Sequence, residues 1–171
     1  LFKHTIERKT SGLYLEADAA LVANEESIFR EDLLEGSSTL LFTLANTGLG
    51  KQIRHFTRWT AEEGILITAQ PASAAKRFLW SIAAPRYYVA RISLVTGKVL
   101  WSQDLGKAFA DLAPLLLDEH GVAVLVFRGS SMRGSWGILC LDVRQGRLLW
   151  KQNLPDRGWS LYPDDGWMVY Y

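Results

Sequence analysis

The chain has 171 residues, of which 49% are hydrophobic and 22% are charged. This composition is typical of a chain that folds around a core, and it excludes a disordered tail. Nineteen basic residues offset eighteen acidic ones, so the net charge is +1 and no basic stripe indicates binding to nucleic acid or to an anionic membrane. A single cysteine, Cys140, excludes an internal disulfide and a thiolate metal cluster.

No hydrophobic run is long enough to predict a membrane span. GVAVLVF, at residues 121–127, is among the longest, whereas a spanning helix needs about 20 residues. The chain begins with Leu1 rather than Met, shows no signal-peptide pattern, and ends at WMVYY within an expected strand. These ends predict a processed or excerpted chain.

In chain order, the sequence predicts short strands that group into units of four. A first unit is expected over residues 12–56, with EESIFREDLLEGSS as an insertion, and a second over 56–105, with QPASAAKRFLWSIAAPR as an insertion. A third is expected over 113–154, and a fourth begins within 159–171. The third unit shows its strands most clearly, at 113–117, 122–127, 136–143 and 147–154.

One ten-residue segment occurs twice. TGKVLWSQDL and QGRLLWKQNL are offset by 49 residues, which aligns Gly97 with Gly146 and Trp101 with Trp150. A further step of 49 residues towards the N-terminus reaches Gly48 in LANTGLGKQI, which we interpret as a degenerate copy without the tryptophan. Because glycine adopts positive φ at no steric cost, these glycines are expected in the turns of hairpins.

A second element also recurs: acidic residues, then glycine, then a hydrophobic run. It appears as EEGILITA, DEHGVAVLVF and DDGWMVYY. Acidic side chains accept hydrogen bonds from the turn backbone and glycine relieves its strain, so this element predicts another hairpin turn. Four-stranded units at a period of about 40 to 50 residues are typical of propeller blades. The sequence therefore predicts an all-β fold, a partial β-propeller of about three to four antiparallel blades.

The repeated tryptophans are expected to pack one blade against the next. The inner strands of a blade are buried between neighbouring sheets, whereas the outer strand is wetter and needs a large side chain to fix its neighbour. A tryptophan buries up to about 250 Å² and still offers its N–H to a backbone carbonyl. We therefore assign Gly97, Trp101, Gly146 and Trp150 as the structural residues of the repeat.

These repeats resemble those of the pyrroloquinoline-quinone-like (quinoprotein-like) β-propeller family. The family pattern is a strand ending in ALD followed by xTGxxLW. ILCLDVRQGRLLW is similar to it at Asp142, Gly146 and Trp150, and VARISLVTGKVLW at Gly97 and Trp101, with serine in place of the aspartate. The resemblance covers residues 56–171 well and the first 55 residues poorly.

The resemblance implies a choice between kinds of function. Family members that are quinone dehydrogenases have about eight blades, a vicinal disulfide beneath the cofactor, Ca²⁺ ligands and a catalytic aspartate. With Cys140 alone, no vicinal pair can form here. Relatives without those residues are mostly scaffolds, so we expect a non-catalytic scaffold or protein–protein interaction module with no cofactor. Family habit favours an extracytoplasmic location, periplasmic or secreted.

Two alternatives stay open. The chain could be a portion of a quinone- and calcium-dependent dehydrogenase whose catalytic residues lie outside this segment. It could also be a propeller that binds a carbohydrate or a small ligand.

The residue patterns predict no metal or catalytic site. His4, His55 and His120 are more than 50 residues apart in sequence, whereas zinc ligands usually include two that are close together. The acidic pairs before glycine are explained as solvated turns rather than as ion ligands.

Aromatic and arginine side chains cluster in or beside the expected loops. Such residues dominate the energetic centres of protein interfaces, although they could instead pack over the propeller edge. The possible interface residues are Arg58, Trp59, Trp80, Tyr87, Tyr88, Arg133 and Trp136.

The number of units has its own consequence. Three and a half blades cannot close a ring, and an open end blade would expose strand edges and a hydrophobic face. We therefore expect a protein partner, or the remaining blades of a longer chain, to complete the propeller.

Overall fold

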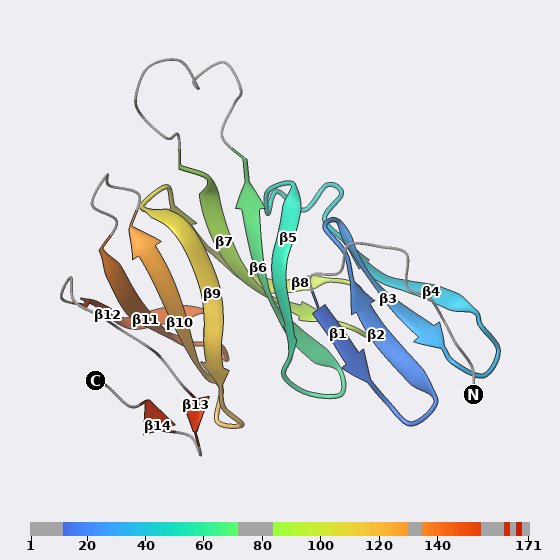
Figure 1. Cartoon of the computed structure of the whole chain (residues 1–171). Helices are drawn as coiled ribbons and strands as arrows, with labels where there is room; N and C mark the ends of the chain where they lie inside the picture. The colour runs from blue at the N-terminus through green and yellow to red at the C-terminus, as the bar shows by residue number, and fades with distance from the viewer. Residues whose placement is uncertain (1–11, 72–83, 130–134, 155–162, 165–166, 169–171) are drawn as a thin grey trace.

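The computed structural model describes residues 12–71, 84–129, 135–154, 163–164 and 167–168, and these residues form an all-β fold (Figure 1). The first sheet contains β1 (Gly12–Leu15), β2 (Ala19–Ala23), β3 (Ser27–Asp32) and β4 (Ser38–Thr43). The second contains β5 (Gln52–Arg58), β6 (Glu63–Gln70), β7 (Arg86–Ser93) and β8 (Val99–Gly106). The third contains β9 (Phe109–Leu117), β10 (Val122–Gly129), β11 (Trp136–Asp142) and β12 (Arg147–Asn153). A short hairpin follows, β13 (Pro163–Asp164) and β14 (Trp167–Met168).

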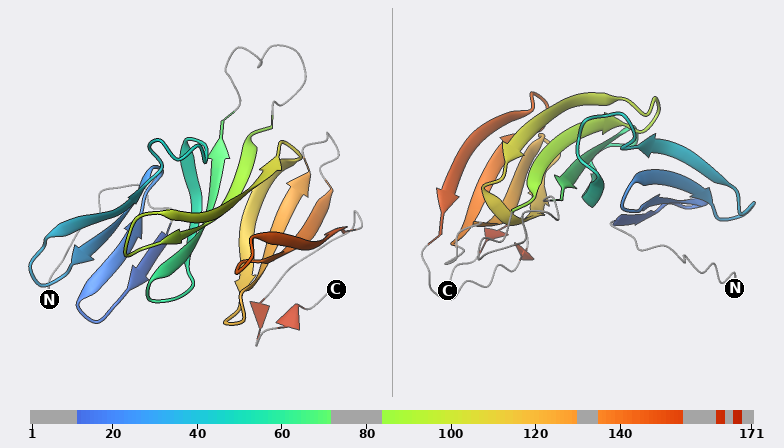
Figure 2. Two further views of the ribbon diagram at one scale, coloured as in Figure 1. Left: turned by 180° about the vertical axis from the view of Figure 1, so that it is seen from behind. Right: turned by 90° about the horizontal axis from the view of Figure 1, so that it is seen from above.

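Each sheet is an antiparallel meander in which the strands pair in chain order. The sheets stand side by side in an open arc, with β1, β5 and β9 on its inner side and β4, β8 and β12 on its outer side (Figures 1 and 2). This is the predicted architecture, an incomplete ring of four-stranded blades. Within the part of the chain that the structure describes, no helix is long and apolar enough to cross a membrane.

The first blade differs from its sequence-based prediction. The expected insertion at residues 25–38 contains β3, which pairs with both β2 and β4. Residue 56, where we placed the end of the first unit, lies inside β5 of the second sheet. The third sheet begins at Phe109, four residues before the expected start of its unit. Most of the insertion expected in the second unit lies outside the described residues.

The turn between the third and fourth strands has the same form in all three blades, and we call it the outer turn. It begins at Asp32, Ser93 or Asp142 and ends four residues later at a glycine with φ between 65° and 70°. The first side chain caps the turn: Oδ1 of Asp32 and of Asp142 each accepts two backbone N–H groups. Those backbone N–H groups, from Glu35 and Leu34, lower the pKa of Asp32.

The outer turn corrects the predicted alignment of the first blade. The equivalent glycine there is Gly36, whereas Gly48 lies in the connection between β4 and β5. Gly36 precedes Gly97 by 61 residues, not 49, because the segments that connect strands differ in length between blades. The first copy of the repeat was therefore placed at the wrong glycine.

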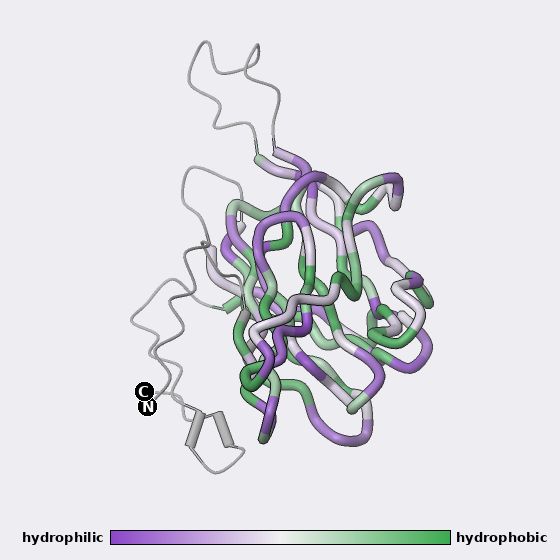
Figure 3. The backbone as a smooth tube through the Cα atoms, turned by 90° about the vertical axis from the view of Figure 1, so that its right-hand side faces the viewer, coloured by the Kyte–Doolittle hydropathy of each residue, from purple (hydrophilic) through white to green (hydrophobic). Residues whose placement is uncertain are grey.

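The hydrophobic core lies between blades rather than within one. One cluster joins the facing sides of the first and second blades, and a second cluster joins the second and third. Both sides of the second blade are therefore covered, and six consecutive residues of β6 are buried. Hydrophobic stretches occur within the strands and hydrophilic ones at many of the turns (Figure 3). Blade junctions are thus the main source of buried apolar surface in this fold.

Candidate functional site

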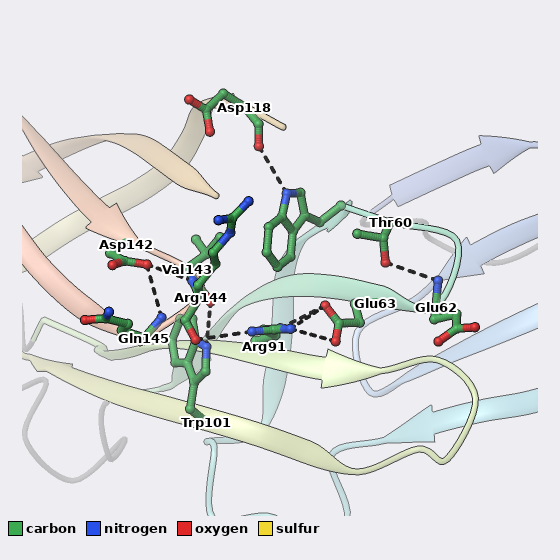
Figure 4. Close-up of polar contacts among 11 residues, drawn as sticks. Thr60, Glu62, Glu63, Arg91, Trp101, Asp118, Asp142, Val143, Arg144 and Gln145 are labelled. Atoms are coloured by element: carbon green, nitrogen blue, oxygen red, sulfur yellow. Dashed lines mark hydrogen bonds and ion pairs between the residues drawn. The ribbon is translucent and has the colours of Figure 1, made fainter. Parts of the chain in front are cut away.

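The junction between the second and third blades centres on Trp101. This side chain projects from β8, and its Nε1–H donates a hydrogen bond to the Val143 carbonyl in the outer turn of the third blade, at 2.7 Å (Figure 4). The indole also covers Gly146, where a Cβ atom would lie 2.6 Å from Cδ2 of Trp101. One side chain therefore fixes the outer turn of the next blade both by contact and by a hydrogen bond.

A second contact between these blades is built on Arg91. Its guanidinium forms a bidentate ion pair with Glu63 at 2.7 and 2.9 Å, and the side chains of both residues are about four-fifths buried. It also lies 4.9 Å from the ring centroid of Trp59 and donates to the Arg144 carbonyl of the third blade. Figure 4 shows Arg91 between Glu63 and Arg144. The bidentate pair therefore orients the Arg91 guanidinium towards the third blade.

The junction between the first and second blades also contains an ion pair, a side-chain to backbone hydrogen bond and a covered outer-turn glycine, but other residues form them. Arg58 of β5 contacts Glu16 of the first blade at 2.5 Å. The Tyr14 hydroxyl donates to the Phe56 carbonyl at 3.1 Å. A Cβ at Gly97 would lie 2.7 Å from the carbonyl oxygen of Leu41, so here backbone of β4, rather than an indole, covers the outer-turn glycine.

The possible interface residues have varied positions. Arg58 contacts the first blade, and Trp59 donates its Nε1–H to the Asp118 carbonyl of the third blade at 3.1 Å. Tyr87 is 1% exposed, and its hydroxyl donates to the Ala110 carbonyl. Tyr88 packs at the edge of the core between the first two blades, whereas Trp136 is 47% exposed. Trp80 and Arg133 lie outside the described residues.

The third blade has a second apolar face, on the side away from the second blade. Leu116, Val124, Cys140 and Trp150 lie opposite one another across its four strands and so project from one side of the sheet. Val124, Ile138 and Cys140 form a cluster of their own. We call this surface the open face. Its centre, Val124, Ile138 and Cys140, is buried, Val122 and Leu154 are partly buried, and Leu116, Trp136 and Trp150 are exposed.

The outer part of the open face is uncovered. Trp136 and Trp150 are 47% and 45% exposed, and every residue of β12 is exposed, whereas exposed and partly buried residues alternate along most of β8. Among the residues that the structure describes, Nε1 of Trp150 makes no hydrogen bond like that of Trp101 to Val143. The strand that should meet a following blade is therefore exposed along its length.

The open face matches the side of the second blade that contacts the third. Strand pairing aligns Arg91 with Cys140, because each lies opposite the repeated tryptophan of its own blade. The same offset of 49 residues aligns Tyr87 with Trp136, Gln103 with Gln152, and Leu105 with Leu154. Residues at these positions of the second blade lie within a junction, so the open face has the composition of a junction surface.

The charged contact of the second blade is missing from the third. The turn hydrogen bonds from Trp59 N to Glu63 O and from Asp118 N to Val122 O occupy equivalent places. Valine and cysteine therefore replace the ion pair of Glu63 and Arg91, and the open face is the more apolar of the two. Burial raises the pKa of the Cys140 thiol, with a contribution from Asp118. The thiol at this face is accordingly neutral near pH 7.

The histidines and acidic residues form no metal site in the described part of the chain, where no group of three or more His, Cys, Asp or Glu side chains could hold an ion. His120 is exposed in the turn before β10, His55 lies in β5, and His4 is outside the described residues. Burial lowers the pKa of His55; Asp111 raises it and Arg54 lowers it further.

No known protein family matches this sequence, and no curated protein does either. Similarity is found among solved structures. Hydrazine synthase of Kuenenia stuttgartiensis aligns with a TM-score of 0.60 and 11% identity, over 85% of this chain and 42% of that one. A europium-containing methanol dehydrogenase aligns with a TM-score of 0.55 and 11% identity, over 88% of this chain and 27% of that one. The chain therefore spans less than half the length of either protein.

These similarities establish the fold and nothing beyond it. A quinoprotein-like β-propeller fold is supported, in agreement with the resemblance seen in the repeats. The open arc of four-stranded blades is a partial β-propeller.

Sequence reasoning missed most of the open face. It selected Trp136 and Trp150 but not Leu116, Val124 or Cys140, because short apolar strands look alike whether one side or both are covered. For Cys140 the signal was available in the repeat offset, which aligns β11 and β12 with β7 and β8 of a blade that has a neighbour on each side.

Proposed function

We propose that this chain is a non-catalytic propeller scaffold that binds protein through the open face of its third blade. The observation that carries this function is the exposure of Trp136 and Trp150 on a face whose counterpart in the second blade forms a junction. Tryptophan in an apolar setting with a polar rim is typical of the energetic centre of a protein interface.

The polar groups around the open face support the same function. Gln152 aligns with Gln103, and among the described residues Nε1 of Trp150 makes no hydrogen bond like that of Trp101. Burying such groups against a protein surface with matching acceptors gives specificity, whereas burial without partners costs free energy. The surface is therefore best suited to a protein partner that supplies matching acceptors.

The experiment measures association of the 171-residue chain by light scattering as a function of concentration. We expect the chain to self-associate, because its open face is apolar, and we expect Trp136→Lys with Trp150→Lys to reduce that association. Leu34→Lys with Val95→Lys is the matched control, since both residues are more than 70% exposed in outer turns away from the open face.

A chain that stays monomeric at all concentrations and melts cooperatively would contradict the proposal. Equal effects of the two double variants would do the same, because charge alone would then explain them. Quinone-dependent alcohol oxidation by the native protein would favour the dehydrogenase alternative.

A further inference from the structure

Two turns of each blade lie side by side at the same edge of the arc. The turn between the first two strands is joined to the outer turn by a backbone hydrogen bond, and this bond is equivalent in the three blades. The donors and acceptors are Leu33 N–H and Asp18 O, Leu94 N–H and Glu62 O, and Val143 N–H and Gly121 O, at 2.7 to 2.8 Å. We call this edge, the lower one in Figure 1, the outer-turn rim; it consists of residues 15–18, 32–37, 59–62, 93–98, 118–121 and 142–146.

The three most exposed large hydrophobic side chains of the described residues lie on this rim, and we call them the apolar tips. Leu15, Leu34 and Val95 are 74%, 75% and 72% exposed, whereas no other exceeds 54%. Leu34 and Val95 occupy the same position of the outer turn, two residues after its capping residue. Turns favour glycine, proline and small polar residues, and neither side chain belongs to the cores between blades. Contact with another molecule therefore explains their apolar character better than the fold does.

The third blade lacks such a tip. Arg144 takes the place of Leu34 and Val95, and its side chain lies over Gly121. A Cβ at that glycine would be 2.9 Å from Cγ of Arg144 and 3.0 Å from Cζ2 of Trp59. Figure 4 shows the Arg144 side chain near Trp59. The apolar tips are therefore confined to the first two blades.

The outer-turn rim is acidic, although the chain as a whole has a net charge of +1. Besides His120, its charged residues are the acidic Glu16, Asp18, Asp32, Glu35, Glu62, Asp118, Glu119 and Asp142 and the basic Lys98 and Arg144. The described connections at the opposite rim contain two of each kind, Glu25, Glu26, Lys51 and Lys107. Glu16 is paired with Arg58. Asp18, Glu35 and Glu62, however, are exposed and make no ion pair with a described residue. The apolar tips therefore stand among carboxylates whose charge is not neutralised within the described part of the chain.

We propose that the outer-turn rim of the first two blades binds a protein segment that carries lysine or arginine beside apolar side chains. The apolar tips match the apolar part of such a segment, and the carboxylates of Asp18, Glu35 and Glu62 match its charge. Nucleic acid and anionic membranes are repelled by the same carboxylates. The rim of the first two blades lies apart from the open face of the third, so this inference does not rest on the proposed function.

The two kinds of side chain on this rim act at different steps of binding. The carboxylates attract a basic segment over about 10 Å at 0.1 M salt, so they raise the association rate. The apolar tips contact the partner only in the complex, so their loss raises the dissociation rate. Removing the charges and removing the apolar tips should therefore change different rate constants.

The first test is photo-crosslinking in the native protein, in its own host, with mass spectrometry of the adducts. Benzoylphenylalanine is incorporated at position 34, at position 95 and, as the control, at position 45. Ala45 is exposed in the connection between β4 and β5, at the opposite rim. Positions 34 and 95 should crosslink to the same protein, on a segment that contains lysine or arginine beside apolar residues, and position 45 should not crosslink to that segment.

Adducts on a neutral or acidic protein segment, on nucleic acid or on lipid would overturn the proposal. The absence of a protein adduct from both rim positions would overturn it as well. Neither result would affect the proposed function, because Trp136 and Trp150 are unchanged in these proteins.

The second test measures the binding rates of the crosslinked segment, made as a peptide, to the native protein by surface plasmon resonance. Glu35→Gln with Glu62→Gln should lower the association rate about tenfold at low salt and have little effect at high salt. Leu34→Ser with Val95→Ser should raise the dissociation rate about tenfold at either salt concentration. Glu26→Gln with Asp111→Asn, near the opposite rim, is the matched control for loss of two carboxylates and should change neither rate. Rates that the two rim variants leave unchanged, or that the control variant changes equally, would overturn the proposal.

Discussion

The second and third blades present the same kind of surface in two different situations. Trp101 is partly buried against the third blade and donates to Val143, whereas Trp150 is 45% exposed and makes no such hydrogen bond among the described residues. Tyr87 is 1% exposed and its counterpart Trp136 is 47% exposed. The comparison shows that a repeat residue acquires its role from the following blade rather than from its own.

Uncharged residues of the second blade's junction surface recur in the third blade, whereas its ion pair does not. Leu105 and Gln103 recur in the third blade as Leu154 and Gln152, but Arg91 does not recur. Of the recurring residues, Leu105 packs against the core between the second and third blades. The ion pair is local to one junction, so substitutions there test that junction alone.

The largest expected effect comes from truncating the repeated tryptophans. Trp101→Ala should lower the free energy of unfolding by about 3 kcal/mol, because it leaves a cavity and an unpaired carbonyl at Val143. Trp150→Ala should lower it by less than about 1 kcal/mol. Urea denaturation followed by circular dichroism measures both. Equal losses of unfolding free energy in the two variants would show that Trp101 and Trp150 contribute equally to stability, contrary to the difference in their contacts.

The outer-turn glycine comes next. Gly146→Ala should cost about 2 to 3 kcal/mol, since the new Cβ meets the indole of Trp101 and alanine is strained at φ +69°. Gly48→Ala is the control: φ is +73° but no atom lies within 4 Å of the new Cβ, so only about 1 kcal/mol of backbone strain is expected. A loss at Gly146 no larger than at Gly48 would show that the indole contact contributes nothing.

The ion pair at the second junction should have a smaller effect. Arg91→Gln should cost about 1 to 3 kcal/mol, because Glu63 is left largely buried without its partner. Arg86→Gln removes a solvent-exposed pair with Asp104 and should leave the urea midpoint unchanged. If Arg91→Gln and Arg86→Gln have the same urea midpoint, the buried ion pair of Arg91 contributes no more to stability than the exposed pair of Arg86.

The smallest expected effect is a dependence on pH. Burial lowers the pKa of His55 in the folded chain, so the unfolded chain binds more protons just below pH 6.5. Stability should therefore fall as the pH decreases through 6.5 towards the lowered pKa of the folded state. His55→Gln should flatten the urea midpoint between pH 7.5 and pH 5.0. His120→Gln, at an exposed turn, controls for loss of a histidine, and an equal flattening there would exclude His55 as the cause.

The second and third blades were predictable because the outer turn and the strand after it carry two residues that other types replace poorly. Glycine at positive φ and a tryptophan four residues later appear at the same spacing in both. The first blade has the glycine, Gly36, but STLLFT in place of the tryptophan-containing strand, so the offset of 49 led to Gly48 instead. A turn glycine that is not followed by a tryptophan is too weak a sequence pattern to align the first blade with the other two.

The roles of the loop residues were not predictable from the sequence. Arg58 and Trp59 are adjacent in the chain but contact opposite neighbours, the first and third blades respectively. Tyr87 and Tyr88 are adjacent in β7 and project to opposite sides of one sheet. Sequence shows that such residues are concentrated there, but the side of the blade on which each side chain lies depends on strand pairing and register.

The hydrogen bond from Trp101 to Val143 joins two residues that are 42 positions apart, and its acceptor is the later of the two in the sequence. During synthesis the indole leaves the ribosome before its acceptor exists, and at about 5 to 20 residues per second the delay is about 2 to 8 s. For that interval the second blade exposes the surface that the third blade exposes in the folded chain. Each blade junction thus forms only after the following blade has been synthesised. Until then, the last blade of the nascent chain exposes an apolar surface that can bind other proteins.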